Sequence, residues 1–341
     1  MPRNKSKVLF IVKGGRNYGM GHLVRAGILI ETFAPFFGIS VLVNGDTYAK
    51  NLFRNRKIKF STYSGTSDLL QFIKKNGSYA FIIVDMLHIS VALLKNIEKY
   101  CRYLIVFDDM QKLTRRRIRG FVICPQETSR SSIERKGGRY SIKGADFFPL
   151  RQKFLFYRKR KAFSPSVKNI LVCLGGGTEP ARTLRLVKLL DGCIDESIKL
   201  HAVIGYVPGE TNKHKFSKRV IFYNTVDNPA RLISRADIGI ISSGFIKFEF
   251  MCIGTPFCLV SLNSHQGILA KKYSSRGYGF YAGNIKDIEA RPKVFCKKIA
   301  MFIVSGSLRE KMFIRARSLI DGRGDLRILN LSQRLLKKGR I

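Results

Sequence analysis

The 341-residue sequence lacks several features that mark secreted and membrane proteins. Its seven cysteines include no Cys-x-x-Cys pair, their number is odd, and most lie in apolar runs, as buried free thiols do. The apolar run after the basic N-terminus covers only residues 8–12, too short for the core of a signal peptide. The longest weakly charged stretch, residues 78–94, is shorter than a membrane span. We therefore expect a reduced, cytoplasmic protein that does not cross a membrane.

Acidic residues are also scarce. The chain has 62 Lys and Arg against 23 Asp and Glu, a formal charge of +39. Basic clusters lie at residues 115–119, 158–161 and 337–340. Such clusters bind nucleic acid or an anionic membrane surface, or they are solvated faces in a proteome biased toward Lys and Arg. No nucleic-acid-binding motif accompanies them, which disfavours a nucleic acid partner and leaves peripheral contact with the inner membrane face open. In each case the positive field attracts phosphate-bearing substrates.

The hydrophobic pattern predicts an α/β fold. Short β-branched runs alternate with longer amphipathic stretches, which is typical of parallel sheets covered by helices. Strands are expected at residues 8–12, 40–43, 81–84, 104–107 and 120–123, and again at 169–174, 199–204, 220–223, 237–241 and 257–261.

Two stretches interrupt this alternation and divide the chain. Residues 126–143 are basic and polar, and residues 154–166 resemble a linker that ends in Ser-Pro-Ser. We therefore expect two Rossmann-like domains in tandem with a cleft between them, over residues 1–155 and 165–310. A helical segment, residues 311–341, follows and is expected to pack back on the first domain.

The segment from Gly19 to Arg25 suits an anionic ligand. It reads Gly-Met-Gly-His-Leu-Val-Arg and lies between the strand at 8–12 and a helix expected to begin near His22. Glycines allow close backbone approach to phosphate, and the amides of a first helical turn point at it. The helix dipole favours a neutral imidazole, which makes His22 a candidate catalytic base. The alternative is an ordinary strand-to-helix turn with a capping histidine.

Further polar segments follow expected strands of the second domain, where ligands of α/β sheets bind. Gly175 and Gly176 belong to a glycine-rich turn before a helix. The Ser242-Ser243-Gly244 turn and the amides of the helix after it suit a diphosphate. Glu249, on that helix between two phenylalanines, suits a ribose diol, and His265 with Gln266 offers polar groups to a sugar.

Three aspartates end strands of the first domain. Asp85 closes one strand, and Asp108 with Asp109 closes the next. Because adjacent side chains of a strand point to opposite faces, we expect no paired metal site there. One carboxylate that orients a loop or His22 is the favoured interpretation.

Motifs spread over nearly the whole chain resemble a known family. They match Gly-x-Gly-His-x-x-Arg, the Asp of Asp-x-Tyr, a double Asp, Leu-Arg-x-x-Phe, Leu-Gly-Gly, a Glu after Gly-Gly-Ser-Thr, Gly-x-Pro and Asp-Gly-x-Gly-x-x-Arg. The matching residues are Gly19–Arg25, Asp85, Asp108-Asp109, Leu150-Arg151 with Phe154, 174–176, Glu249, 254–256, and 321–324 with Arg327. The chain thus resembles the hydrolases that remove UDP from UDP-2,4-diacetamido-2,4,6-trideoxy-β-L-altropyranose in pseudaminic acid synthesis, and the related spore-coat polysaccharide biosynthesis (SpsG-like) proteins. More distantly it is similar to the peptidoglycan N-acetylglucosaminyltransferase.

The resemblance implies a GT-B type fold whose C-terminal domain holds UDP, with neither metal nor other cofactor. It implies that His22 is the catalytic base, with Asp85 beside it in the catalytic set. The substrate contacts that it implies, together with the turns above, are Gly21, Arg25, Gly175, Gly176, Ser242, Ser243, Gly244, Glu249, His265 and Gln266.

Departures from the family's pattern leave the reaction open. Leu87 replaces the Tyr of Asp-x-Tyr, His265 replaces an Asn, and residues 242–245 replace Gly-Gly-Ser-Thr. Hydrolysis of a UDP-activated amino or deoxy sugar is the leading hypothesis. Its alternatives are a glycosyltransferase that moves the sugar to a lipid or polysaccharide acceptor, and an inactive basic module that binds nucleic acid or lipid. The sequence leaves the sugar and the oligomeric state open.

Overall fold

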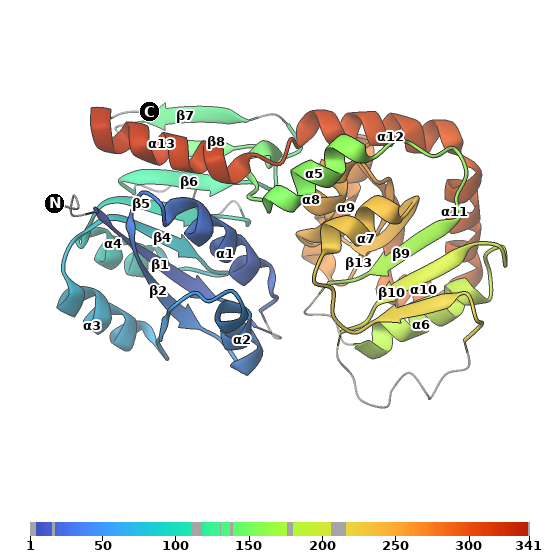
Figure 1. Cartoon of the computed structure of the whole chain (residues 1–341), viewed down its shortest axis with the longest axis horizontal. Helices are drawn as coiled ribbons and strands as arrows, with labels where there is room; N and C mark the ends of the chain where they lie inside the picture. Colours follow the sequence, from blue (N-terminus) through green and yellow to red (C-terminus); the bar gives the residue numbers. More distant parts are fainter. Residues whose placement is uncertain are drawn as a thin grey trace. The chain divides into compact units, whose positions relative to one another are not determined.

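The computed structural model describes residues 5–15, 18–110, 113, 118–129, 131–136, 139–175, 180–205 and 216–339 (Figure 1). The chain divides into two compact units. Unit 1 contains Met1–Leu150 and Arg323–Ile341, and unit 2 contains Arg151–Gly322. Each unit is built on its own sheet, so each has its own core. No helix among the described residues is both long and apolar enough to span a membrane.

Unit 1 is an eight-stranded sheet in the order β3-β2-β1-β4-β5-β6-β8-β7. Neighbouring strands are parallel except for the hairpin β7–β8. The strands are β1 (Lys7–Lys13), β2 (Gly38–Asn44), β3 (Ser61–Thr62), β4 (Tyr79–Asp85), β5 (Cys101–Phe107), β6 (Gly120–Cys124), β7 (Ser132–Lys136) and β8 (Arg139–Lys143). The helices are α1 (Gly21–Phe33), α2 (Thr47–Asn55), α3 (Thr66–Asn76), α4 (Val91–Glu98), α13 (Gly324–Lys338) and the short 3-10 helix η1 (Ala145–Phe147).

Side chains alternate between the two faces of this sheet, and both faces are covered. Phe10 and Val12 of β1 pack in the same core as residues of α1, α2 and α13, whereas Leu9 and Ile11 share the other core with residues of α3 and α4. Burial on both faces explains the continuous apolar runs that mark these strands in the sequence. The C-terminal helix α13, red in Figure 1, contacts α1 and completes unit 1.

Unit 2 is a six-stranded, all-parallel sheet in the order β11-β10-β9-β12-β13-β14. Its strands are β9 (Asn169–Cys173), β10 (Lys199–Val203), β11 (Val220–Tyr223), β12 (Ile238–Ser242), β13 (Phe257–Ser261) and β14 (Phe280–Asn284). Its helices are α5 (Gln152–Arg160), α6 (Pro180–Asp191), α7 (Pro229–Arg235), α8 (Ile246–Ile253), α9 (Ser264–Ser275), α10 (Ile285–Ala290), α11 (Pro292–Val304) and α12 (Gly306–Leu319).

Both sheets have a topological switch point. In unit 1 the chain winds outward in opposite directions from β1 and β4, and in unit 2 from β9 and β12. Ligands of open α/β sheets bind beyond the carboxyl ends of the strands at such points. Helix α1, which follows β1, carries His22 in its first turn, and Asp85 is the last residue of β4. The loops after β9 and β12 carry Gly175 and Ser243. The topology therefore gathers most of the predicted site residues at two sheet edges.

Every predicted strand is present, but two stretches that we expected to be irregular are ordered. The basic stretch 126–143 contains the hairpin β7–β8, and the expected linker 154–166 begins within helix α5. The segment 311–341 is divided, since α12 belongs to unit 2 and α13 to unit 1. All seven cysteines are free.

Two residues of the basic cluster at 158–161 form hydrogen bonds within unit 2. Arg158 donates hydrogen bonds to the backbone carbonyl groups of Cys252, Arg317 and Ile320. Lys161 donates to those of Ser234 and Ala236. These two side chains fix helix α5 to its neighbours rather than presenting charge to a partner.

Candidate functional site

His22 lies at the start of α1, directly after the glycine turn that follows β1. Gly19 has φ +83°, a left-handed conformation that glycine adopts without strain. The turn ends at Met20, the N-cap residue, and Gly21 is the first residue of the helix. The helix therefore begins where the motif predicted, and His22 occupies its first turn. The His22 side chain is buried, with a relative exposure of 7%.

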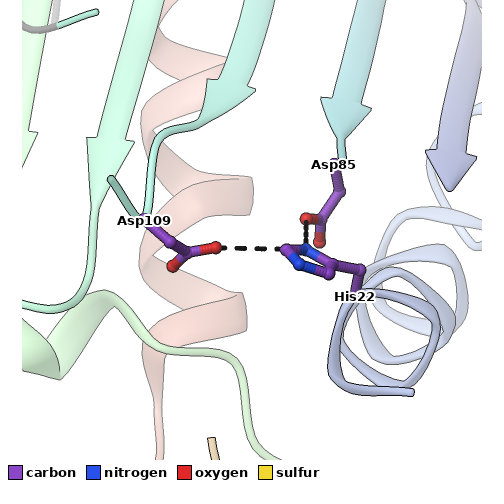
Figure 2. Close-up of side chains that lie close together, drawn as sticks. All are labelled: His22, Asp85 and Asp109. Atoms are coloured by element: carbon purple, nitrogen blue, oxygen red, sulfur yellow. Dashed lines mark hydrogen bonds and ion pairs between the residues drawn. The ribbon is translucent and has the colours of Figure 1, made fainter. Parts of the chain in front are cut away.

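Asp85 holds the His22 ring. It is the last residue of β4, the strand next to β1, and its Oδ1 lies 2.6 Å from His22 Nδ1 (Figure 2). The second carboxylate near the ring is Asp109, whose Oδ2 lies 3.9 Å from the same nitrogen. This distance is too long for a hydrogen bond. Asp85 is therefore the residue that orients the imidazole.

Arg25 links both carboxylates from one turn further along α1. It donates to both oxygens of Asp85, from Nη2 at 2.6 Å and from Nε at 2.7 Å. It also donates to both oxygens of Asp109, from Nη2 at 2.7 Å and from Nη1 at 3.0 Å. Its guanidinium lies 4.1 Å from the ring centre of Phe107, and its side chain is fully buried. These contacts hold Arg25 against Asp85 and Asp109, and its predicted contact with substrate stays a prediction.

The charges of this cluster favour the ionised form of Asp85. Burial alone would raise the pKa of Asp85, but Arg25 and His22 lower it to about 2. Burial alone would lower the pKa of Arg25, whereas Asp109 and Asp85 raise it above its ordinary value. Two carboxyl groups face one guanidinium, and a proton on His22 would add a second positive charge beside them. An imidazolium formed during a reaction is therefore stabilised here.

This geometry gives His22 the arrangement of a general base. An ionised carboxylate only accepts hydrogen bonds, so the ring nitrogen facing Asp85 carries the proton. The lone pair of the neutral ring is then on Nε2, which leaves that atom able to accept a proton. The same division of work between an aspartate and a histidine occurs in hydrolases on unrelated folds.

The cluster does not have the donor set of a cation site. His22, Asp85 and Asp109 each offer a ligand atom, and the three atoms lie within 4.8 Å of one another. However, Arg25 donates to every oxygen of both carboxylates. A metal ion would have to displace a buried guanidinium of like charge.

Asp108 and Asp109 have separate roles although they are adjacent. Asp108 Oδ2 accepts a hydrogen bond from the backbone N–H of Leu113 at 2.5 Å and so shapes the loop after β5. Asp109 accepts hydrogen bonds from Arg25. The candidate set from the sequence omitted Asp109, although the double aspartate after a buried strand was the signal that could have found it.

The loop after β12 forms the second group of predicted residues, in unit 2. Ser242 and Ser243 are buried, and Gly244 N lies 3.4 Å from Ser242 Oγ. Gly175, in the loop after the neighbouring strand β9, has φ +96°. A side chain at Gly175 would begin 3.7 Å from Ser242 Oγ, so the two loops meet at this sheet edge. Gly176 lies outside the described residues.

Glu249 lies in the first turn of α8, after this loop. Burial raises its pKa to about 7, and the positive charge of Arg151 only partly offsets this effect. A carboxyl group that is half protonated near neutral pH both donates and accepts hydrogen bonds. Such a group suits a diol, which is what the sequence predicted for Glu249.

Lys247, between this loop and Glu249, was not predicted. Its side chain is fully buried, and its Nζ donates to the carbonyl oxygens of Ser243 at 3.2 Å and Gly244 at 3.1 Å. It also lies 4.4 Å from the ring centre of Phe248 and 4.9 Å from that of Tyr273. A lysine within a short helical stretch is typical of a surface helix, so the sequence contains little sign that this lysine is buried.

His265 and Gln266 lie in the first turn of α9, after β13. Asn263 caps this helix by accepting from Gln266 N at 2.9 Å, and Gln266 Oε1 accepts from Leu262 N at 3.0 Å. This reciprocal pair resembles a capping box. The Gln266 carbonyl oxygen therefore shapes the loop, while its amide group and the half-buried His265 are the parts that suit a ligand.

Comparisons with known proteins agree on the fold. No protein-family model matches the chain. The chain is 22% identical to the spore coat polysaccharide biosynthesis protein SpsG of Bacillus subtilis (strain 168) over 334 residues, covering 95% of this chain and 97% of that protein. This similarity confirms the predicted resemblance to SpsG-like proteins.

Solved structures match over nearly the whole chain. Acinetobacter baumannii MurG matches with a TM-score of 0.66 at 14% identity, covering 96% of this chain and 99% of that one. The calicheamicin glycosyltransferase CalG4 matches with a TM-score of 0.68 at 11% identity, covering 98% and 99%. S. aureus MnaA, in a co-structure with UDP, matches with a TM-score of 0.62 at 11% identity, covering 97% of each chain. These likenesses confirm the predicted α/β fold with two Rossmann-like domains.

Proposed function

We propose that this protein is an enzyme of polysaccharide biosynthesis that acts on a UDP-activated sugar, and that it hydrolyses a UDP-linked amino or deoxy sugar. The observation that carries the proposal is the 2.6 Å contact between His22 Nδ1 and Asp85 Oδ1 at the switch point of unit 1. SpsG, a polysaccharide biosynthesis protein by name, and MnaA, which was solved with UDP, support the substrate class.

The catalytic step follows from the protonation of the cluster. Asp85 accepts a hydrogen bond from His22 Nδ1–H, and His22 Nε2 takes a proton from water as its oxygen attacks the anomeric carbon of the sugar. The bond between that carbon and the diphosphate oxygen breaks, and UDP leaves with the electron pair. The carboxylates of Asp85 and Asp109 stabilise the imidazolium that forms.

Within unit 2, the loops after β9 and β12 are the proposed site of UDP. We assign the diphosphate to the amides of the Ser242-Ser243-Gly244 turn and to the glycine turn that contains Gly175 and Gly176. Glu249 binds the ribose diol. His265 and the Gln266 amide are further substrate contacts that we assign in unit 2, and Gly21 is the one that we assign in unit 1.

Transfer of the sugar to an acceptor is the second candidate function. CalG4 is a glycosyltransferase by name, and unit 1 carries a polar cavity of about 410 Å³ at the carboxyl ends of β1 and β2. Its lining includes Gly14, Asn44, Lys50 and Tyr63, a mixture of backbone and polar side chains that suits hydroxyl groups. A membrane-bound acceptor would add peripheral contact with an anionic membrane face.

Incubation with UDP-sugars in the absence of an acceptor tests the proposal. We expect the wild-type protein to release UDP and free sugar at a catalytic rate, and His22→Ala to lose this turnover while it still binds UDP by calorimetry. UDP release that requires an added lipid or polysaccharide acceptor would favour the transferase. Near-normal turnover by His22→Ala would refute the role of His22.

A further inference from the structure

Lys247 is a buried cation directly beneath a turn that we assign to phosphate. Taking a lysine out of water is costly unless carbonyl dipoles or counter-charges stabilise its ammonium. Here the ammonium donates to two consecutive carbonyl groups, those of Ser243 and Gly244, and lies against the faces of two aromatic rings. Aromatic faces carry partial negative charge and also stabilise a cation. The site is therefore built to hold the charge in one position.

The two carbonyl contacts fix the direction of the amides that follow them. In a trans peptide the N–H points opposite to the C=O of the same peptide plane, and the chain has no cis peptide among the described residues. The carbonyl groups of Ser243 and Gly244 point toward Lys247, so the N–H groups of Gly244 and Phe245 point away from it, and the Gly244 N–H also makes a long hydrogen bond of 3.4 Å to Ser242 Oγ. Successive outward N–H groups form an anion-binding concavity.

A second observation also indicates a ligand at this turn. The hydroxyl oxygen of Ser243 is buried and has no hydrogen-bond partner within the part of the chain that the structure describes. The Ser243 residue as a whole is 1% exposed. A buried hydroxyl without a partner is uncommon in native proteins and calls for an explanation. An anion seated on the turn would accept its proton.

We infer that Lys247 is a positioning residue for a diphosphate: it presets the Ser243–Phe245 turn and supplies a fixed positive charge behind it. The inference rests on the proposed UDP site and extends it by assigning this charge to a residue inside the protein. The charge would stabilise the two phosphates in the bound substrate and the additional negative charge that develops as UDP leaves.

Lys247→Met tests this inference, because methionine keeps the length of the side chain but removes the donor and the charge. Replacing a buried charge with an apolar group of similar volume is often neutral or stabilising, so we expect an equal or higher melting temperature. By calorimetry we expect UDP and inorganic pyrophosphate to bind about tenfold more weakly or worse, while uridine binds as it does to wild type. Weaker binding of the two anions with unchanged uridine binding and melting temperature would distinguish a role in anion binding from a role in folding.

Lys271→Met is the matched control. Lys271 is an exposed residue of α9, so its loss changes the net charge of unit 2 equally without touching the turn. We expect unchanged affinity for UDP and pyrophosphate. Equal UDP affinity of wild type and Lys247→Met would overturn the inference, as would a parallel loss of uridine binding and melting temperature. If the wild-type protein binds pyrophosphate in a Lys247-dependent way but not UDP, the inference stands and the proposed function fails.

Discussion

Replacing Asp85 with asparagine removes one charge from the His22 cluster and leaves the size of the side chain nearly unchanged. In the wild-type protein Asp85 accepts hydrogen bonds from His22 and from two nitrogens of Arg25. Asparagine presents an N–H group to one of these donors, so either the His22 ring or the Arg25 guanidinium loses its acceptor. Asp109 still pairs with Arg25, which limits the structural damage.

The stability cost follows from the pKa of Asp85. The pKa falls from its ordinary value of 3.8 to about 2 in the folded protein, because Arg25 and His22 outweigh the effect of burial. This difference corresponds to about 2 kcal/mol of stability. Because the folded-state pKa lies below the unfolded one, this stability is present above about pH 4 and is lost as the pH falls toward 2. We expect Asp85→Asn to be less stable by about 2–3 kcal/mol at pH 7, with a smaller deficit in acid.

Activity should fall much further than stability. Without a carboxylate at Nδ1, the His22 ring no longer holds the tautomer that leaves Nε2 basic, and such losses lower kcat by about 10³–10⁴-fold in comparable sites. Asp109→Asn is the matched control, since it also removes a carboxylate from Arg25 but lies 3.9 Å from His22 Nδ1. We expect it to lower stability similarly and kcat by only about tenfold.

Urea unfolding at several pH values and steady-state release of UDP from a UDP-sugar measure the two effects. Both variants should keep the circular dichroism spectrum of the folded protein. Wild-type turnover by Asp85→Asn would refute the assignment of Asp85 as the orienting residue. Equal losses of kcat in both variants would show that the whole cluster, rather than its contact with Nδ1, supports catalysis.

Three further predictions concern residues of unit 2, and the last compares one of them with Gly339 of unit 1. Because the pKa of Glu249 rises from 4.5 to about 7, the wild-type protein loses stability as the pH increases from 4.5 to 7. Glu249→Gln should therefore be about 1–2 kcal/mol more stable than wild type at pH 8. Thermal melts at pH 4 should show no such gain. Ser243→Ala should leave the melting temperature unchanged or higher because its hydroxyl has no partner in the described structure, but UDP affinity by calorimetry should drop about fivefold; unchanged affinity would argue against phosphate at this turn. Gly254→Ala should lower the free energy of unfolding in urea by about 2–3 kcal/mol, because Gly254 has φ +95° and a Cβ there would lie 2.6 Å from Arg317 Cδ. Gly339→Ala should lower it by only about 1 kcal/mol, because Gly339 has φ +65° but open space around it.

The parts of the fold that the sequence predicts well are those whose pattern is local. Strands such as β4 and β12 are buried on both faces, so each appears as an unbroken apolar run. The helix start at Gly21 follows from its glycine turn. The local pattern indicates a linker where the structure has helix α5, because this helix is stabilised by contacts with residues far along the chain. The hydrogen bonds from Arg158 to backbone carbonyl groups are examples. A local pattern contains no sign of such contacts.

The site shows the same division. His22 and Asp85 follow or end neighbouring parallel strands, so the sequence predicts that they lie at the same sheet edge. The partners of Arg25 depend on side-chain burial, and the sequence alone equally allows an arginine that contacts phosphate. Lys247 is the clearest omission, because only its full burial distinguishes it from a surface lysine. Its neighbours Phe248 and Phe250, both buried, were the available hint.

Chemical rescue of His22→Ala tests the central claim most directly. Truncation removes the ring but leaves Asp85 and Arg25 in place, so added imidazole can occupy the vacated volume and accept the proton. We predict that His22→Ala releases no UDP from UDP-sugars above background, and that imidazole restores release in a saturable manner while a bulkier amine buffer of equal pKa does not. Undiminished release by His22→Ala without imidazole would contradict the account.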